Sequence, residues 1–86
     1  MGLLLKADGT KNHVVPKNGK TFSLKEMQGF VGGYIEMLQL QDGRIMWCNE
    51  EGKLKGLPVN SLATSACKYF DTIVGDVLIT EPGEVE

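Results

Sequence analysis

The chain has 86 residues, of which 42% are hydrophobic and 23% charged, and its formal net charge is −2. This length suits one small domain with a modest core and leaves little room for a deep, enclosed active site. The composition excludes a disordered chain, the acidic balance argues against DNA or RNA as a partner, and no apolar run is long enough to span a membrane.

Positive charge is concentrated in the first quarter of the chain. Residues 1–25 contain one acid, Asp8, and five lysines: Lys6, Lys11, Lys17, Lys20 and Lys25. A basic end can steer an anionic ligand or partner, but lysines also solvate loops and protect edge strands from pairing. Solvation of loops and of an edge strand is the interpretation that we favour.

Two cysteines, Cys48 and Cys67, lie nineteen positions apart and form no C-x-x-C motif. Since no secretory signal pattern precedes them, we expect reduced thiols that pack as small hydrophobic side chains in a cytoplasmic protein. The chain has one histidine, His13, which leaves too few ligands for a His/Cys metal site. We predict no metal and no cofactor.

The first half of the chain predicts two strands, a helix and a hairpin. Strands are expected at 3–6 and 13–16, on either side of a turn at Asp8-Gly9. The segment 23–26 (SLKE) fits a capping box, so we expect a helix from Ser23 to Val31 that Gly32 ends in the left-handed conformation. Segments 34–40 and 45–48 then form a hairpin around Asp42-Gly43.

The second half predicts a short third leg of the meander at 53–55, a helix from Ser61 to about Tyr69 that Asn60 caps, and a last strand at 73–79. Together the elements indicate an α+β fold, with a small, mostly antiparallel sheet of about five strands and two short helices packed on one face. We expect residues 1–80 to form the single domain and residues 81–86 to form a disordered acidic tail.

The glycines after the first predicted helix are the first candidate site. Phosphate loops lead from a strand into the N-terminus of a helix, whereas Gly32 and Gly33 follow a helix and open a strand. A helix stop and a tight turn are therefore the favoured interpretation. The alternative is that the backbone N–H groups of Gly32 and Gly33 approach a ligand, beside Tyr34 as a stacking ring.

Two acids interrupt apolar strands, Glu36 in 34–38 and Asp76 in 74–78. They could form an acid/base pair, but such acids more often point from the solvent face of a sheet or hold a structural partner. Asn49 and Asn60 are a turn residue and a helix cap first, and candidate recognition residues second.

Four segments in order carry a resemblance to a known family: VGGYIE at 31–36, NEEGKL at 49–54, GLPVN at 56–60 with Ala63-Thr64, and DTIVGDVL at 71–78. They resemble a family of small domains of unknown function that is common in phages, plasmids and other bacterial mobile elements. The resemblance implies a standalone or accessory protein in that setting, without an assigned activity or functional residues.

We therefore predict a non-catalytic binding protein, of the kind that contacts a host protein or counters a host defence. Its partner would be a protein or a small anionic ligand. One alternative is a homo-oligomer that sequesters a nucleotide-like ligand, and a second is a small hydrolase that uses Glu36 and Asp76. The candidate site residues are Gly32, Gly33, Tyr34, Glu36, Asn49, Asn60 and Asp76.

Overall fold

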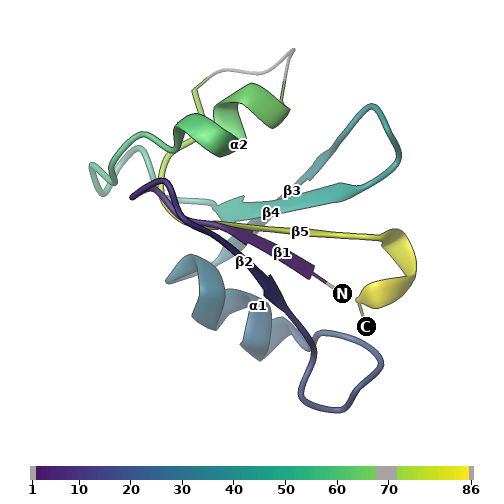
Figure 1. The fold of residues 1–86 in the computed structure, drawn as a ribbon. Helices are drawn as coiled ribbons and strands as arrows, with labels where there is room; N and C mark the ends of the chain where they lie inside the picture. The colour runs from purple at the N-terminus through teal and green to yellow at the C-terminus, as the bar shows by residue number, and fades with distance from the viewer. Residues whose placement is uncertain (1, 68–71, 86) are drawn as a thin grey trace.

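A five-stranded antiparallel sheet forms the middle of the molecule (Figure 1). The computed structural model describes residues 2–67 and 72–85. The strands are β1 (Gly2–Leu5), β2 (Lys11–Val14), β3 (Ile35–Gln39), β4 (Ile45–Asn49) and β5 (Val77–Thr80), in the order β2-β1-β5-β4-β3. The helices are α1 (Leu24–Val31) and α2 (Ser61–Ala66), and a 3-10 helix, η1, covers Pro82–Glu84. The predicted α+β class and antiparallel sheet are confirmed.

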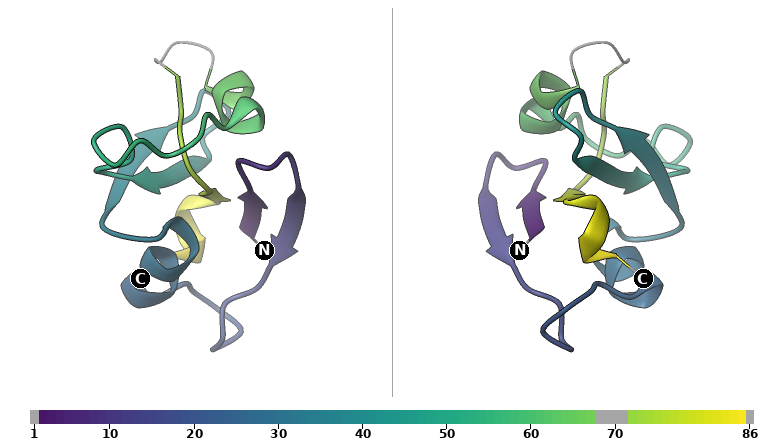
Figure 2. Two further views of the ribbon diagram at one scale, coloured as in Figure 1. Left: turned by 90° about the vertical axis from the view of Figure 1, so that its left-hand side faces the viewer. Right: turned by 90° about the vertical axis from the view of Figure 1, so that its right-hand side faces the viewer.

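The two helices lie on opposite faces of the sheet, so the prediction that both pack on one face is wrong (Figures 1 and 2). Alternation along β5 explains this arrangement, because successive side chains of a strand point to opposite faces. Val77 and Ile79 join the core under α2, whereas Leu78 between them joins the core over α1. A strand that is apolar at every position, as β5 is up to Thr80, is the pattern of a strand covered on both sides.

Helix α1 begins and ends where the sequence predicts. The Ser23 hydroxyl accepts a hydrogen bond from the Glu26 amide at 3.1 Å, and the Glu26 carboxylate accepts one from the Ser23 amide at 3.1 Å. Gly32 ends the helix with φ 83°, in the left-handed region that glycine enters without a steric penalty. Neither of the two described helices is long and apolar enough to cross a membrane.

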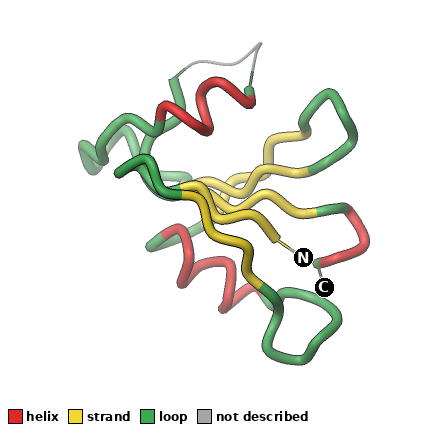
Figure 3. The backbone as a smooth tube through the Cα atoms, in the orientation of Figure 1, coloured by secondary structure: helices red, strands yellow, loops and turns green. Residues whose placement is uncertain are grey.

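Several boundaries differ from the sequence prediction. The second strand, expected at 13–16, covers Lys11–Val14. Residues 53–55 form turns and not a third leg of the meander (Figure 3). The last strand starts at Val77, because Gly75 adopts φ 76° and only an isolated bridge joins Val74 to Val59 before it. Helix α2 ends at Ala66, and Tyr69, where we expected the end, lies outside the described residues.

The acidic end of the chain packs against the body, in place of the disordered tail that we expected. The Phe22 amide donates to the Glu84 carbonyl at 2.7 Å, and Val85 forms a parallel bridge with Phe22. The Phe22 ring is fully buried, and it lies so close to Gly2 that a Cβ there would come within 2.9 Å of it. The tail therefore stabilises the position of Phe22 over the end of β1.

Ending the chain after Thr80 should lower the free energy of unfolding by about 1–3 kcal/mol, because it removes a backbone hydrogen bond and exposes apolar surface beside Phe22. Urea denaturation of the truncated and full chains measures the difference. Gly83→Ala is the control, since nothing lies within 4 Å of the added Cβ and the tail stays in place. A truncated chain as stable as the full chain would contradict this role of the tail.

Candidate functional site

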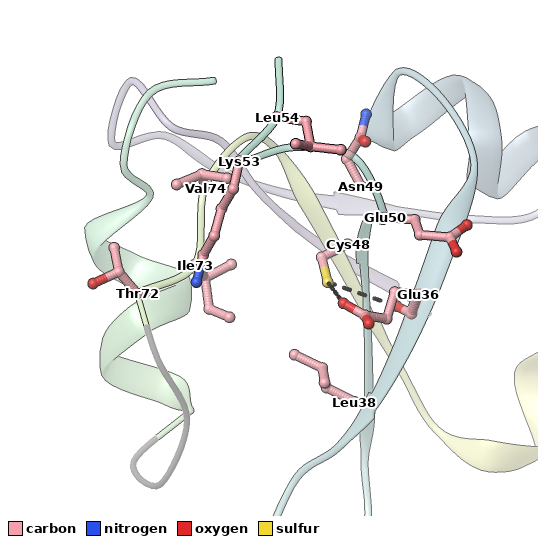
Figure 4. A pocket seen from close by; sticks show the side chains of 10 residues that line it. All are labelled: Glu36, Leu38, Cys48, Asn49, Glu50, Lys53, Leu54, Thr72, Ile73 and Val74. Atoms are coloured by element: carbon pink, nitrogen blue, oxygen red, sulfur yellow. Dashed lines mark hydrogen bonds between the residues drawn. The ribbon is translucent and has the colours of Figure 1, made fainter. Parts of the chain in front are cut away.

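An open pocket of about 270 Å³ lies on the α2 side of the sheet, beside the free edge of β3 (Figure 4). Its walls come from β3 and β4, from the loop after β4 and from the segment before β5. The residues that line it are Glu36, Leu38, Cys48, Asn49, Glu50, Lys53, Leu54, Thr72, Ile73 and Val74.

Three of the four family-like segments meet at this pocket. Glu36 comes from the first segment, four wall residues come from the segment 49–54, and the run 72–74 comes from the last. The remaining family-like segment, 56–60, does not line the pocket but supports it through Asn60, which is described below. The pairing of β3 with β4 sets Glu36 directly opposite Cys48, so that residues far apart in the sequence share one wall.

The pocket has an apolar floor and a charged rim. Cys48 and Ile73 are buried and belong to the core under α2, and Leu38 packs against that core. The carboxylates of Glu36 and Glu50 lie at the rim, and the Lys53 side chain runs down beside Ile73 (Figure 4). Such a lining suits an apolar group that carries positive charge or hydrogen-bond donors at its end.

The Cys48 thiol touches Glu36 but is not activated by it. Its Sγ lies 3.7 Å from the Glu36 carbonyl oxygen and 3.9 Å from Oε1. Burial, and after it the negative charge of Glu36, raises the pKa of Cys48 to about 11. The thiolate is the nucleophilic form of cysteine, so Cys48 is a poor nucleophile at neutral pH. Cys67 is also buried and free, and burial raises its pKa as well.

Gly32 and Gly33 do not offer their N–H groups to the pocket. Both amides donate to the Gln28 carbonyl, at 2.8 and 3.1 Å, and so complete the C-terminal turn of α1. Gly33 has a separate reason to lack a side chain, because a Cβ there would lie 3.0 Å from Nδ2 of Asn49. The second glycine therefore leaves room for the Asn49 side chain.

Asn49 lines the pocket, but its amide group serves the backbone. Its Nδ2 donates to the Val31 carbonyl at 3.2 Å, and its Oδ1 accepts from the Glu51 amide at 2.8 Å. Both contacts join the end of α1 to the turn after β4. Asn49 is thus a structural link next to the site.

Asn60 is fully buried, and its side chain bonds backbone groups of the protein itself. Its Oδ1 accepts from the Ala63 amide at 3.0 Å, as the predicted N-cap of α2. Its Nδ2 donates to the carbonyls of Leu5 and Gly75 at 2.9 and 2.7 Å. Its own amide donates to the Ile73 carbonyl at 2.8 Å, which holds the wall segment of the pocket in place.

Tyr34 and Asp76 lie outside the pocket. The Tyr34 ring is 66% exposed and is not on the wall. Asp76 accepts a hydrogen bond from the Ala7 amide at 2.9 Å, at the end of β1. Asp76 lies before β5, next to the end of β1, whereas Glu36 lies on the edge strand β3, on the far side of β4. The structure does not bring the two acids together as a catalytic pair.

Of the seven predicted site residues, Glu36 and Asn49 line the pocket. Sequence reasoning missed the apolar floor, because Leu38, Cys48 and Ile73 look like ordinary core positions. The remaining wall residues stood inside the family-like segments, which were the only signal that could have identified them. No group of three His, Cys, Asp or Glu side chains within residues 2–67 and 72–85 could hold a metal ion.

A family model described as "Domain of unknown function (DUF3846)" matches residues 2–86. This match confirms the resemblance that the four segments indicated. No curated protein and no solved structure matches the chain.

Replacing Asn60 by alanine should lower the free energy of unfolding by about 2–4 kcal/mol, because a helix cap is lost and two buried carbonyls lose their donor. Chemical denaturation measures this loss. Ser61→Ala, at the exposed next position, is the control. Asn60→Asp keeps the cap acceptor but not the donors, and should also be strongly destabilising. A mild effect of both Asn60 variants would contradict the role of the amide.

Cys48 should resist alkylation in the folded protein. A thiol with a pKa near 11 carries about 100-fold less thiolate at pH 8 than one at the ordinary value of 9.0, before any steric protection. The Cys48 thiol ionises at a lower pH in the unfolded chain than in the folded chain. The free energy of unfolding should therefore fall as the pH rises from about 9 to 11. Iodoacetamide labelling at pH 8, with and without urea and with mapping of the labelled peptides, measures the protection. Equal labelling rates in both conditions would contradict it.

Proposed function

The chain belongs to this family of domains of unknown function, and we propose that it is a non-catalytic binding protein whose pocket takes up a side chain of a partner protein. The convergence of three family-like segments on one concave surface carries this proposal. The mobile-element setting implied by those segments supports a host protein as the partner.

The size of the pocket favours a partner's side chain over a free metabolite. At about 270 Å³ it falls just below the range of roughly 300–1,000 Å³ that is usual for small-molecule sites. It is also open on one side, with an exposed apolar side chain, Leu54, at its rim. An open pocket of this kind suits an anchor residue that projects from a larger surface.

The lining of the pocket argues against a nucleotide-like ligand. The amides of Gly32 and Gly33 are bonded to Gln28, and the lining carries two carboxylates, Glu36 and Glu50, against one ammonium group, that of Lys53. These acids would repel a phosphate, whereas they would attract a cationic or hydrogen-bond-donating group.

The chemistry of the described residues supports binding over catalysis. The Cys48 thiol keeps its proton well above neutral pH, and Asp76 bonds the Ala7 amide outside the pocket that Glu36 lines. The histidine, His13, is exposed on β2, at the opposite edge of the sheet from the pocket. Among the described residues, the Cys48 thiol and the Glu36 carboxylate meet at the pocket, but the raised pKa of Cys48 leaves it protonated and a poor nucleophile.

Affinity capture from a bacterial host lysate tests the proposal. Leu54→Arg places a bulky cation at the rim, and because Leu54 is 89% exposed the fold should tolerate it. We expect a partner that the wild-type chain retains to be reduced at least about tenfold by Leu54→Arg, as for a central anchor site. Glu50→Lys, which reverses a charge of the rim, should weaken the same partner.

Leu24→Arg is the matched control, since Leu24 is also an exposed leucine but lies on α1, away from the pocket. It should retain the partner at the wild-type level. A partner that both arginine variants retain equally, or that both lose equally, would contradict the pocket as the binding site. So would the absence of any partner specific to the wild-type chain.

A further inference from the structure

Strand β3 is the last strand of the sheet, and no described segment pairs with its outer side (Figure 1). Its pairing with β4 fixes which backbone groups face outward. The Glu50 amide donates to the Tyr34 carbonyl and the Leu40 amide to the Arg44 carbonyl, so these opposed residues are hydrogen-bonded pairs. Since such pairs alternate along an antiparallel ladder, Ile35, Met37 and Gln39 direct their N–H and C=O groups away from β4.

This edge carries one charged residue, Glu36, but has neither lysine nor proline, which protect many edge strands. The opposite edge, β2, is short and largely exposed, carries Lys11 and is soon followed by Pro16. Lysine and proline are common means by which proteins block unwanted strand pairing. β3 contains neither, and Met37 on it is 58% exposed. The contrast indicates that the β3 edge is kept available for a partner.

The edge is continuous with the pocket, because Glu36 and Leu38 of β3 are also part of its wall. A strand added beside β3 would carry every second side chain onto the pocket face, next to Glu36 and within reach of the Glu50 rim. Its other side chains would lie on the face of Met37. The carboxylates favour lysine or arginine in the first set, and the exposed methionine favours apolar residues in the second.

We infer that the edge of β3 accepts an extended basic segment of the partner protein as a sixth, antiparallel strand. This inference rests on the proposed function and specifies its partner. Backbone hydrogen bonds to Ile35, Met37 and Gln39 supply affinity, and side chains at the pocket supply specificity, as in other cases of strand addition.

A second copy of the chain suits this edge less well. In an antiparallel pair of β3 strands centred on Met37, Glu36 would stand opposite Leu38 of the other copy. Such a pair brings no base to the two carboxylates, whereas a basic segment neutralises them.

The test is fluorescence anisotropy with a labelled octapeptide that alternates valine and lysine. In the antiparallel arrangement, valines facing Met37 direct their amides toward β3, and lysine amides point away. Methylating the nitrogens of the two central valines should therefore weaken binding at least about tenfold, while the same change at two lysines should not. An octapeptide of valine and glutamate should not bind.

Two protein variants test the same contact from the other side. Met37→Pro removes an outward N–H at an edge position where proline is tolerated, and Met37→Thr keeps it. We expect Met37→Pro alone to weaken the valine–lysine peptide at least about tenfold, with thermal melts showing that both variants fold. Glu36→Lys should also abolish the preference for lysine over glutamate.

Equal binding of both methylated peptides, or no effect of Met37→Pro in a folded protein, would overturn strand addition. A dimer in light scattering that Met37→Pro converts to monomer would assign the edge to a second copy and overturn the basic segment. These outcomes are separate from the capture experiment. If Leu54→Arg fails to reduce capture, the pocket proposal fails whatever the peptide does; if only the peptide test fails, the pocket proposal stands.

Discussion

The buried amide of Asn60 is the contact on which the site most depends. The side chain caps α2 and donates hydrogen bonds to the Leu5 carbonyl at the end of β1 and to the Gly75 carbonyl. The backbone amide of the same residue donates to the Ile73 carbonyl. A buried amide that lost these partners would leave several polar groups unsatisfied, so α2, the end of β1 and the segment before β5 are fixed together. The wall of the pocket at 72–74 therefore owes its position to a residue that does not line it. The hydroxyl of Thr64 adds to this, since it accepts from the Ile73 amide at 3.0 Å.

The two faces of the sheet are covered to different extents, and this difference creates the pocket. On one face, α1 and the end of the chain enclose Phe22, Met27 and Leu78 in a closed core. On the other face, α2 has six residues and packs over the middle of the sheet, which leaves the outer part of β3 and β4 to the loops. Loops seldom pack as closely as a helix, so a partly apolar hollow remains there, next to the unpaired edge of β3.

Several polar residues that stood out in the sequence proved to serve the backbone. Asn49, Asn60 and Asp76 each bond main-chain groups that would otherwise be unsatisfied, and the two glycines end a helix and admit the Asn49 side chain. In a domain of this size, loops and helix ends hold a large share of the polar groups, so polar residues in conspicuous patterns are often needed to satisfy them. Glu36 is the exception, because its carboxylate serves no backbone group in the hydrogen bonds described and lies at the pocket rim.

The local features follow from the amino-acid sequence: the capping box at Ser23, the Gly32 stop, the Asn60 cap, the hairpins and the α+β class. These depend on residues a few positions apart, whose preferences act within one turn or one hairpin. The sheet face that each helix covers and the register of the strands depend on contacts between distant segments. A two-residue turn at Asp42-Gly43 would have set Glu36 opposite Asn49, but Leu40 pairs with Arg44 around a longer loop, and Glu36 therefore faces Cys48. A shift of one residue moves every side chain of a strand to the other face, so the pocket could not be read from the sequence.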